Sequence, residues 1–93
     1  MSDYALFLHA DAAAFFHSLR REEKEPLRRF LDLLEQYPTT EGEATERDSV
    51  GRTVQVKFVR RFKVVYWAHH AGKEIKILRL ERLRASQVGS DLS

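Results

Sequence analysis

This sequence of 93 residues has no cysteine, two prolines, four glycines and one tryptophan. Without cysteine, neither disulfide bonds nor a thiolate metal site can stabilise the fold. No segment approaches the roughly 20 apolar residues that a membrane-spanning helix needs. The first residues, Met-Ser-Asp-Tyr, lack the basic region and apolar run of a secretory signal. We therefore expect a soluble protein of the cytoplasm that has no membrane contact and needs neither a metal nor a cofactor.

The apolar content, 43% of the residues, is high enough for a folded core and argues against disorder. A chain of this length forms one domain, near the small end of what folds without cross-links. After residue 84 the residues are small and polar, as in a chain end that is not packed. We expect a single domain over 1–84, followed by a flexible tail over 85–93.

Charge is divided unevenly along the chain. Residues 52–84 contain ten Lys or Arg against two acidic residues, a formal charge of +8. The other residues contain six basic and twelve acidic side chains, a formal charge of −6, and the stated net charge is +2. A mild net charge therefore conceals a strongly basic segment, which is the best functional clue in the sequence.

The same segment has the patterns of three strands. In the first, Val54, Val56 and Phe58 alternate with polar residues, as in a strand with one buried row. The next two, over 62–68 and 74–80, are richer in β-branched and aromatic residues. Connections this short join antiparallel neighbours, so the three strands form a meander. Tyr66 and Trp67 are consecutive and must point to opposite faces; an exposed aromatic ring would suit base stacking, and a buried one would lie beneath a helix.

The first half of the chain predicts one strand and two helices. Residues 4–9 are a candidate strand, and residues 12–21 a first helix with an apolar face. In the second helix Leu27, Phe30, Leu31 and Leu34 follow the spacing of a buried helical face. Because Pro26 is tolerated only near a helix start, the helix should begin near residue 21 or 22, and Pro38 should end it.

Residues 39–49 are polar and acidic, and we interpret them as a solvated irregular connection rather than a functional acidic cluster. The element order is then β-α-α-β-β-β. Two closely joined helices bury their apolar faces on the sheet. The sequence thus predicts an α+β domain in which a helical hairpin packs on a four-stranded antiparallel sheet.

Over roughly residues 4–83 the chain resembles the RelE/ParE superfamily of bacterial type II toxins. The resemblance rests on the first strand, the helix ending in Leu-Glu-Gln-Tyr-Pro at 34–38, and the Gly51-Arg52 entry into the second strand. It also rests on Phe-Lys-Val-Val-Tyr at 62–66 and Glu-Ile-Lys-Ile-Leu at 74–78.

This resemblance implies a toxin of a toxin–antitoxin system, associated with plasmid stabilisation and neutralised by an acidic antitoxin. RelE-like members cleave mRNA on the ribosome without a metal, whereas ParE-like members bind DNA gyrase and are not nucleases. Fold alone does not choose between these activities.

Metal-free RNA cleavage needs a base for the ribose 2′-hydroxyl, cations for the developing phosphorane charge and an acid for the leaving oxygen. The resemblance implies that Lys57, Lys63 and Arg82 occupy the family's catalytic basic positions. Arg84 is an alternative to Arg82 for the last of these positions. Lys57, on the outward row of its strand, is the candidate base or principal phosphate ligand. The residues expected to contact RNA or phosphate are Arg60, Arg61, Arg79, Arg84 and Gln55.

The chain departs from the family pattern at three places. Gln55 stands where a second basic residue would be, Arg60 and Arg61 replace the usual glycine between the second and third strands, and Gly89 lies near the position of a catalytic tyrosine. Three readings stay open: a ribosome-dependent mRNA endoribonuclease that binds ribosome and mRNA, an inhibitor of DNA gyrase, and a non-catalytic homologue that binds only its antitoxin. The basic face could also be a solvated surface that prevents edge pairing.

Overall fold

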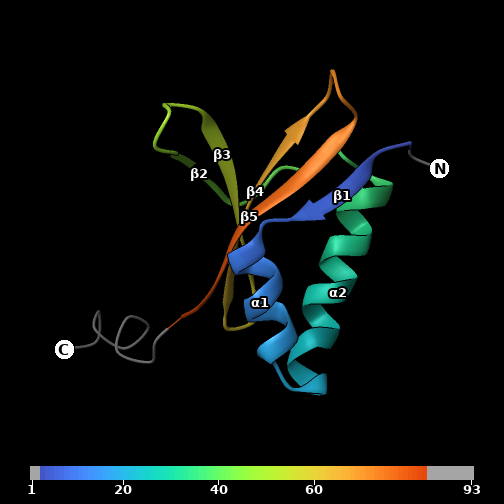
Figure 1. Ribbon diagram of the computed structural model, residues 1–93, viewed down its shortest axis with the longest axis vertical. Helices are drawn as coiled ribbons and strands as arrows, with labels where there is room; N and C mark the ends of the chain where they lie inside the picture. The colour runs from blue at the N-terminus through green and yellow to red at the C-terminus, as the bar shows by residue number, and fades with distance from the viewer. Residues whose placement is uncertain (1–2, 84–93) are drawn as a thin grey trace.

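A computed structural model describes residues 3–83, which form two helices and five strands. Along the chain these are β1 (Ala5–Leu8), α1 (Ala10–Ser18), α2 (Arg21–Gln36), β2 (Ala44–Arg47), β3 (Thr53–Val59), β4 (Phe62–His69) and β5 (Glu74–Arg82). Figure 1 shows the helices on the opposite side of the molecule from the β2–β3 hairpin. The α+β class and the helical hairpin are confirmed. Arg84 and the expected tail over 85–93 lie outside the described residues.

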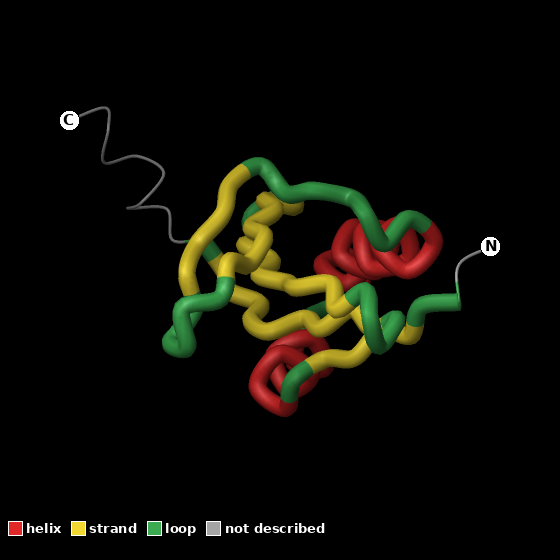
Figure 2. Tube along the Cα trace, turned by 90° about the horizontal axis from the view of Figure 1, so that it is seen from above, coloured by secondary structure: helices red, strands yellow, loops and turns green. Residues whose placement is uncertain are grey.

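The sheet differs from the predicted four-stranded antiparallel sheet in two ways. Its order is β1-β5-β4-β3-β2, so it has five strands, and β1 runs parallel to β5 while the other pairs are antiparallel. The fifth strand, β2, comes from the segment expected to be irregular; Figure 2 shows the connection that leads to it from α2. As an edge strand β2 needs no apolar row, so its sequence gave no sign of it.

The main core lies between the helices and one side of the sheet. All four residues of the predicted apolar face of α2, Leu27, Phe30, Leu31 and Leu34, are buried, which confirms that prediction. They pack with α1 and with one face of β4 and β5, and the register shift opposite Val65 and Tyr66 separates Ile77 from the next residue of β5 on that face. The residues are Phe62, Val64, Tyr66, Ile75, Ile77 and Leu80. Tyr66 lies edge-on to Phe30, with ring centroids 5.6 Å apart. Alternation therefore identifies which residues of β4 face the helices, whereas in β5 the register shift interrupts it.

A smaller apolar cluster lies on the other side of the sheet, away from the helices. It consists of Val54, Val56 and Val65, with Trp67 and Leu78 packed against it. Tyr66 and Trp67 thus point to opposite faces, as predicted, and Trp67 is the one that no helix covers. Phe58, expected in the buried row of β3, is 40% exposed because it lies beyond this cluster near the end of the strand.

Helix α2 begins at Arg21, as the position of Pro26 predicted. The backbone N–H of Arg20 donates to Glu23 Oε1 at 3.0 Å, so Glu23 satisfies a donor at the start of the helix. Helix α1 covers Ala10–Ser18, shorter at its end than the predicted 12–21, because Leu19 and Arg20 take up extended backbone between the helices. The tight junction places the first turn of α2 beside the sheet, where it contributes to the site described next.

Candidate functional site

The two lysines assigned to catalysis lie on opposite faces of the sheet. Lys57 is paired with Val64, which faces the helices, whereas Lys63 is paired with Phe58 on the other face. Residues opposite each other on neighbouring strands project to the same side, and neighbours along a strand project to opposite sides. The structure therefore does not bring Lys57 and Lys63 together, and the predicted basic set divides into two groups.

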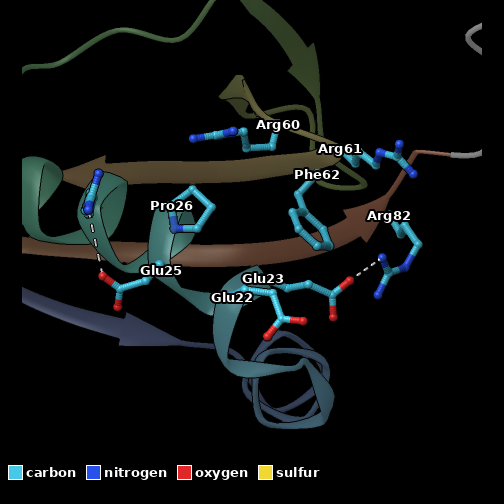
Figure 3. Close-up of a pocket in the computed structure, with 9 residues that line it drawn as sticks. Glu22, Glu23, Glu25, Pro26, Arg60, Arg61, Phe62 and Arg82 are labelled. Atoms are coloured by element: carbon cyan, nitrogen blue, oxygen red, sulfur yellow. Dashed lines mark hydrogen bonds and ion pairs between the residues drawn. The ribbon is translucent and has the colours of Figure 1, made fainter.

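The first group lies on the helix side, in a cleft of about 440 Å³ between the start of α2 and the β3–β4 turn. Arg60, Arg61 and Arg82, all predicted site residues, line this cleft from the sheet (Figure 3). The N–H of Leu83 donates to the carbonyl oxygen of Arg61 at 2.7 Å, which fixes the end of β5 against the turn. The remaining lining residues are Phe62 and, from α2, Glu22, Glu23, Glu25, Pro26 and Arg29.

Arg82 is held in place by a carboxylate and an aromatic ring. Its Nη1 donates to Glu23 Oε2 at 2.7 Å, and its guanidinium lies 5.1 Å from the centroid of the Phe62 ring. The bond from Arg82, followed by that from the Arg20 backbone, lowers the pKa of Glu23 below its ordinary value. Arg82 is thus oriented before any ligand arrives, but its charge is partly balanced by Glu23.

Arg60 occupies a backbone conformation that L-residues rarely adopt. Its φ is +58°, in the left-handed region where glycine is favoured. Neither Arg60 nor Arg61 forms an ion pair within residues 3–83, and in Figure 3 the two side chains extend in different directions. The β3–β4 turn therefore carries two guanidinium groups without ion pairs in the described residues, at the edge of a cleft whose other side carries Glu22, Glu23 and Glu25.

Lys57 lies on the helix side of β3 but does not line the cleft. Its Nζ is 3.4 Å from Glu43 Oε1, and its side chain is 36% exposed. Its charged contact is thus a carboxylate. The predicted RNA ligand Gln55 is on the same row and accepts a bond from the Gly42 N–H at 2.9 Å, which anchors the chain before β2.

The second group lies on the face away from the helices, where Glu46 connects two cations. Lys63 Nζ donates to Glu46 Oε2 at 2.6 Å, and Arg79 Nη2 donates to Glu46 Oε1 at 2.9 Å. Arg79 also lies 3.4 Å from Glu81. The bond from Lys63 is the largest influence that lowers the pKa of Glu46. The segment 39–49 is thus no plain solvated connection, because its acidic residues pair with the basic segment.

Trp67 lies on this second face among further cations, which sequence reasoning did not assign to a site. The guanidinium of Arg52 is 4.1 Å from the Trp67 ring centroid, and Lys76 Nζ is 5.8 Å from it. The His69 ring stacks on Trp67 with centroids 5.0 Å apart. Arg52 is oriented by Asp48, at 2.8 Å. Alternation along β4 was the signal for this cluster, since it places residues 63, 65, 67 and 69 on one face.

Within residues 3–83, no three His, Cys, Asp or Glu side chains gather as they would to hold a metal ion. Over the same residues, neither helix has the length and apolar character needed to cross a membrane.

The sequence matches no known family, but the fold matches solved structures. No family model and no curated protein matches this sequence. The isolated RelE toxin of E. coli superposes with a TM-score of 0.74 at 18% identity, covering 96% of this chain and 94% of that one. The chain has the RelE/ParE toxin fold.

Two other solved structures share this fold. One is the archaeal RelE–RelB complex from Pyrococcus horikoshii, with a TM-score of 0.69 at 21% identity, covering 85% of this chain and 93% of that one. The other belongs to the ParDE toxin–antitoxin system of P. aeruginosa, with a TM-score of 0.61 at 21% identity, covering 87% and 97%. RelE and ParDE toxin–antitoxin structures thus share this architecture, and at 21% identity the likeness extends to the fold alone.

Proposed function

We propose that this protein is the toxin of a type II toxin–antitoxin system and a metal-independent, ribosome-dependent mRNA endoribonuclease of the cytoplasm. The carrying observation is the β3–β4 turn, where Arg60 keeps a strained left-handed backbone and Arg60 and Arg61 lack carboxylate partners in residues 3–83. A residue other than glycine is strained in this backbone conformation, and strained residues cluster at functional sites. Uncompensated guanidinium groups beside an oriented Arg82 suit the recognition of phosphate.

In this proposal the helix-side residues share the work of RNA cleavage. Lys57 takes the proton of a ribose 2′-hydroxyl, whose oxygen attacks the adjacent phosphorus. The bond from phosphorus to the 5′-oxygen breaks, which leaves a 2′,3′-cyclic phosphate, and the 5′-oxygen takes a proton from water to leave as a hydroxyl group. Arg60, Arg61 and Arg82 stabilise the charge that develops on the phosphoryl oxygens. Lys63 lies on the other face, so we assign it no catalytic step.

The partner of the resting toxin is an antitoxin, a proposal supported by the RelE–RelB complexes among the structures with this fold. The segment 52–84, with its formal charge of +8, is the complementary surface. Charge attraction of this kind mainly accelerates association, so charge-removing variants in 52–84 should slow complex formation more than they speed its dissociation.

A second candidate function, inhibition of DNA gyrase through protein binding, is favoured by one observation. Four of the predicted cations, Lys57, Lys63, Arg79 and Arg82, already contact carboxylates of this chain. A protein-binding surface tolerates such pairs, whereas an RNA phosphate must compete with them. A toxin homologue that only binds its antitoxin would show the same pairs.

Lys57 variants test the nuclease proposal. Lys57→Ala should reduce ribosome-dependent mRNA cleavage by about 10²–10⁴-fold, the usual cost of losing a general base. The melting temperature should hardly change, because an exposed ion pair such as Lys57–Glu43 contributes little to stability. Lys57→Arg should not restore cleavage, since a guanidinium group stays protonated.

Lys73→Ala, at the β4–β5 turn, is the matched control and should cleave like the wild type. If Lys57→Ala and Lys57→Arg are both as toxic as the wild type, Lys57 is a surface lysine and the proposed mechanism is wrong.

A further inference from the structure

The first strand leaves one edge of the sheet open. In the order β1-β5-β4-β3-β2, β1 pairs with β5 alone within residues 3–83. The backbone N–H groups of Ala5 and His9 donate to carbonyl oxygens on the β5 side, both at 3.0 Å. Because these groups alternate in direction along a strand, the N–H and C=O groups of Leu6 and Leu8 point away from the sheet. A further strand can form hydrogen bonds with them there.

This edge lacks the charged side chains, prolines and bulges that usually prevent exposed strands from pairing. β1 reads Ala-Leu-Phe-Leu in one continuous register with β5, and Phe7 is 48% exposed. The strand at the opposite edge, β2, contains Glu46 and Arg47. An apolar edge without such protection is a template for another strand. We propose that β1 pairs with β1 of a second copy of this chain across a two-fold axis, which makes one sheet continuous through both copies.

The sequence around β1 is complementary to itself in one antiparallel register. A two-fold axis at Leu6 places the Leu6 residues of the two copies opposite each other, so that their outward N–H and C=O groups exchange hydrogen bonds. The same axis places Phe7 opposite Ala5 of the second copy, whose small side chain leaves room for the aromatic ring. It also places the exposed carboxylate of Asp3 opposite the imidazole of His9. Size and charge therefore match along the whole pairing.

The start of α1 selects this register over the next symmetric one. The backbone of His9 is extended, with ψ 155°, and α1 begins at Ala10. An axis at Leu6 pairs residues 3–9 of both copies, whereas an axis at Phe7 would pair only 5–9. Seven residues from each copy are fewer than the roughly 20–30 a side of a stable interface. The dimer should therefore be weak and dissociate on dilution.

The dimer contact lies apart from the candidate cleft. β1 pairs with residues 74–77 at the start of β5, whereas Arg82 lies at the other end of that strand. Arg60 and Arg61 belong to the β3–β4 turn, and neither strand of that turn is next to β1 in the sheet. Dimer formation therefore does not depend on RNA cleavage, and either proposal can fail while the other stands.

Sedimentation velocity on the purified full chain, over a range of concentrations, tests the dimer. The mass of the wild type should rise from 10.9 kDa toward twice that value and fall again on dilution. Phe7→Lys should keep the mass of a single chain, because a lysine at the edge protects it from pairing. Leu33→Lys is the matched control, since Leu33 is 43% exposed on α2, and this variant should associate like the wild type.

Cysteine cross-linking tests the register, because the chain has no cysteine of its own. Ala5→Cys and Phe7→Cys are oxidised separately and as an equal mixture. In the proposed register these two positions face each other without hydrogen bonds between them, at roughly 4.5 Å between Cα atoms, which a disulfide can span. Two copies of the same variant place their cysteines diagonally, about 7–8 Å apart. The mixture should therefore form covalent dimers several times faster than either variant alone.

A wild type that keeps the mass of a single chain at every concentration would overturn the proposal and leave the edge to a strand of another protein. Association that persists in Phe7→Lys would overturn it as well. Covalent dimers that form no faster in the mixture than in the separate variants would contradict the pairing. If Phe7→Lys does not fold, as judged by circular dichroism, the cross-linking result decides.

Discussion

Replacing Arg60 by glycine should stabilise the fold and weaken the function. At φ +58° an L-residue is strained by roughly 1–2 kcal/mol, because Cβ lies too close to the carbonyl oxygen. Glycine relieves this strain. It also makes the unfolded chain more flexible, so that folding loses more conformational entropy, which costs about 0.5–1 kcal/mol. Arg60 forms no ion pair within residues 3–83 that the substitution would remove. The free energy of unfolding should therefore rise by about 0.5–1 kcal/mol.

In a domain of this size such a gain raises the melting temperature by about 2–8 °C, which thermal unfolding followed by circular dichroism can resolve. If Arg60 contacts a phosphate, Arg60→Gly should also reduce the salt slope of RNA binding by ~0.7. Toxicity on induction should fall in parallel. The variant would then be more stable and less active, as expected where function retains a strained residue.

Lys73→Gly provides the matched control for this experiment. Lys73 has φ +54° at the β4–β5 turn, and its one ion pair within residues 3–83, to Asp3 at 3.3 Å, is well exposed. It should gain similar stability without loss of RNA affinity. If neither glycine variant is more stable, the strain argument is wrong. If Arg60→Gly gains stability and keeps full RNA affinity and toxicity, Arg60 is not retained for a ligand.

Two further predictions concern the supports of the site. Gly42→Ala should lower the free energy of unfolding by about 1–3 kcal/mol in urea, because its Cβ would clash with the backbone oxygen of Val56; an unchanged value would contradict this packing. Acid should also destabilise the fold, because Arg82 lowers the pKa of Glu23 in the folded state, so the unfolded chain binds the proton more readily. This contribution to stability is complete above the ordinary glutamate pKa of ~4.3 and is lost as pH falls below it. Urea unfolding at several pH values should show that the stability of Glu23→Gln depends less on acid than that of the wild type. The same acid dependence in both proteins would refute the assignment.

The sequence predicted those parts of the fold that depend on buried rows. The spacing of Leu27, Phe30, Leu31 and Leu34 predicted the face of α2, and the alternation of Val54 and Val56 predicted a strand; both rows are buried. The direction of β1 could not be predicted, since a helical hairpin can return the chain to either end of a sheet. β2 could not be predicted either, because an exposed edge strand leaves no apolar pattern.

The site was harder to predict than the fold because it depends on registers. Shifting a strand by one residue moves every side chain to the other face. Basic residues on three strands therefore looked like one surface, although pairing separates Lys57 from Lys63. The carboxylates that neutralise these cations come from distant segments, such as Glu23 in α2 and Glu46 in β2. Only the arginines of the β3–β4 turn, adjacent in sequence, were certain to come from one turn, although their side chains extend in different directions.

The central claim, that this toxin-like fold cleaves mRNA on the ribosome, is tested most directly by inducing the wild-type chain in a heterologous bacterium. Primer extension on a reporter message would then map any cuts. The account predicts growth arrest within the first generations and new 5′ ends spaced in phase with codons, both absent for Lys57→Ala. Growth arrest with intact mRNA and DNA-damage signalling would contradict it and indicate gyrase as the target, and unimpaired growth with intact mRNA would contradict it as well.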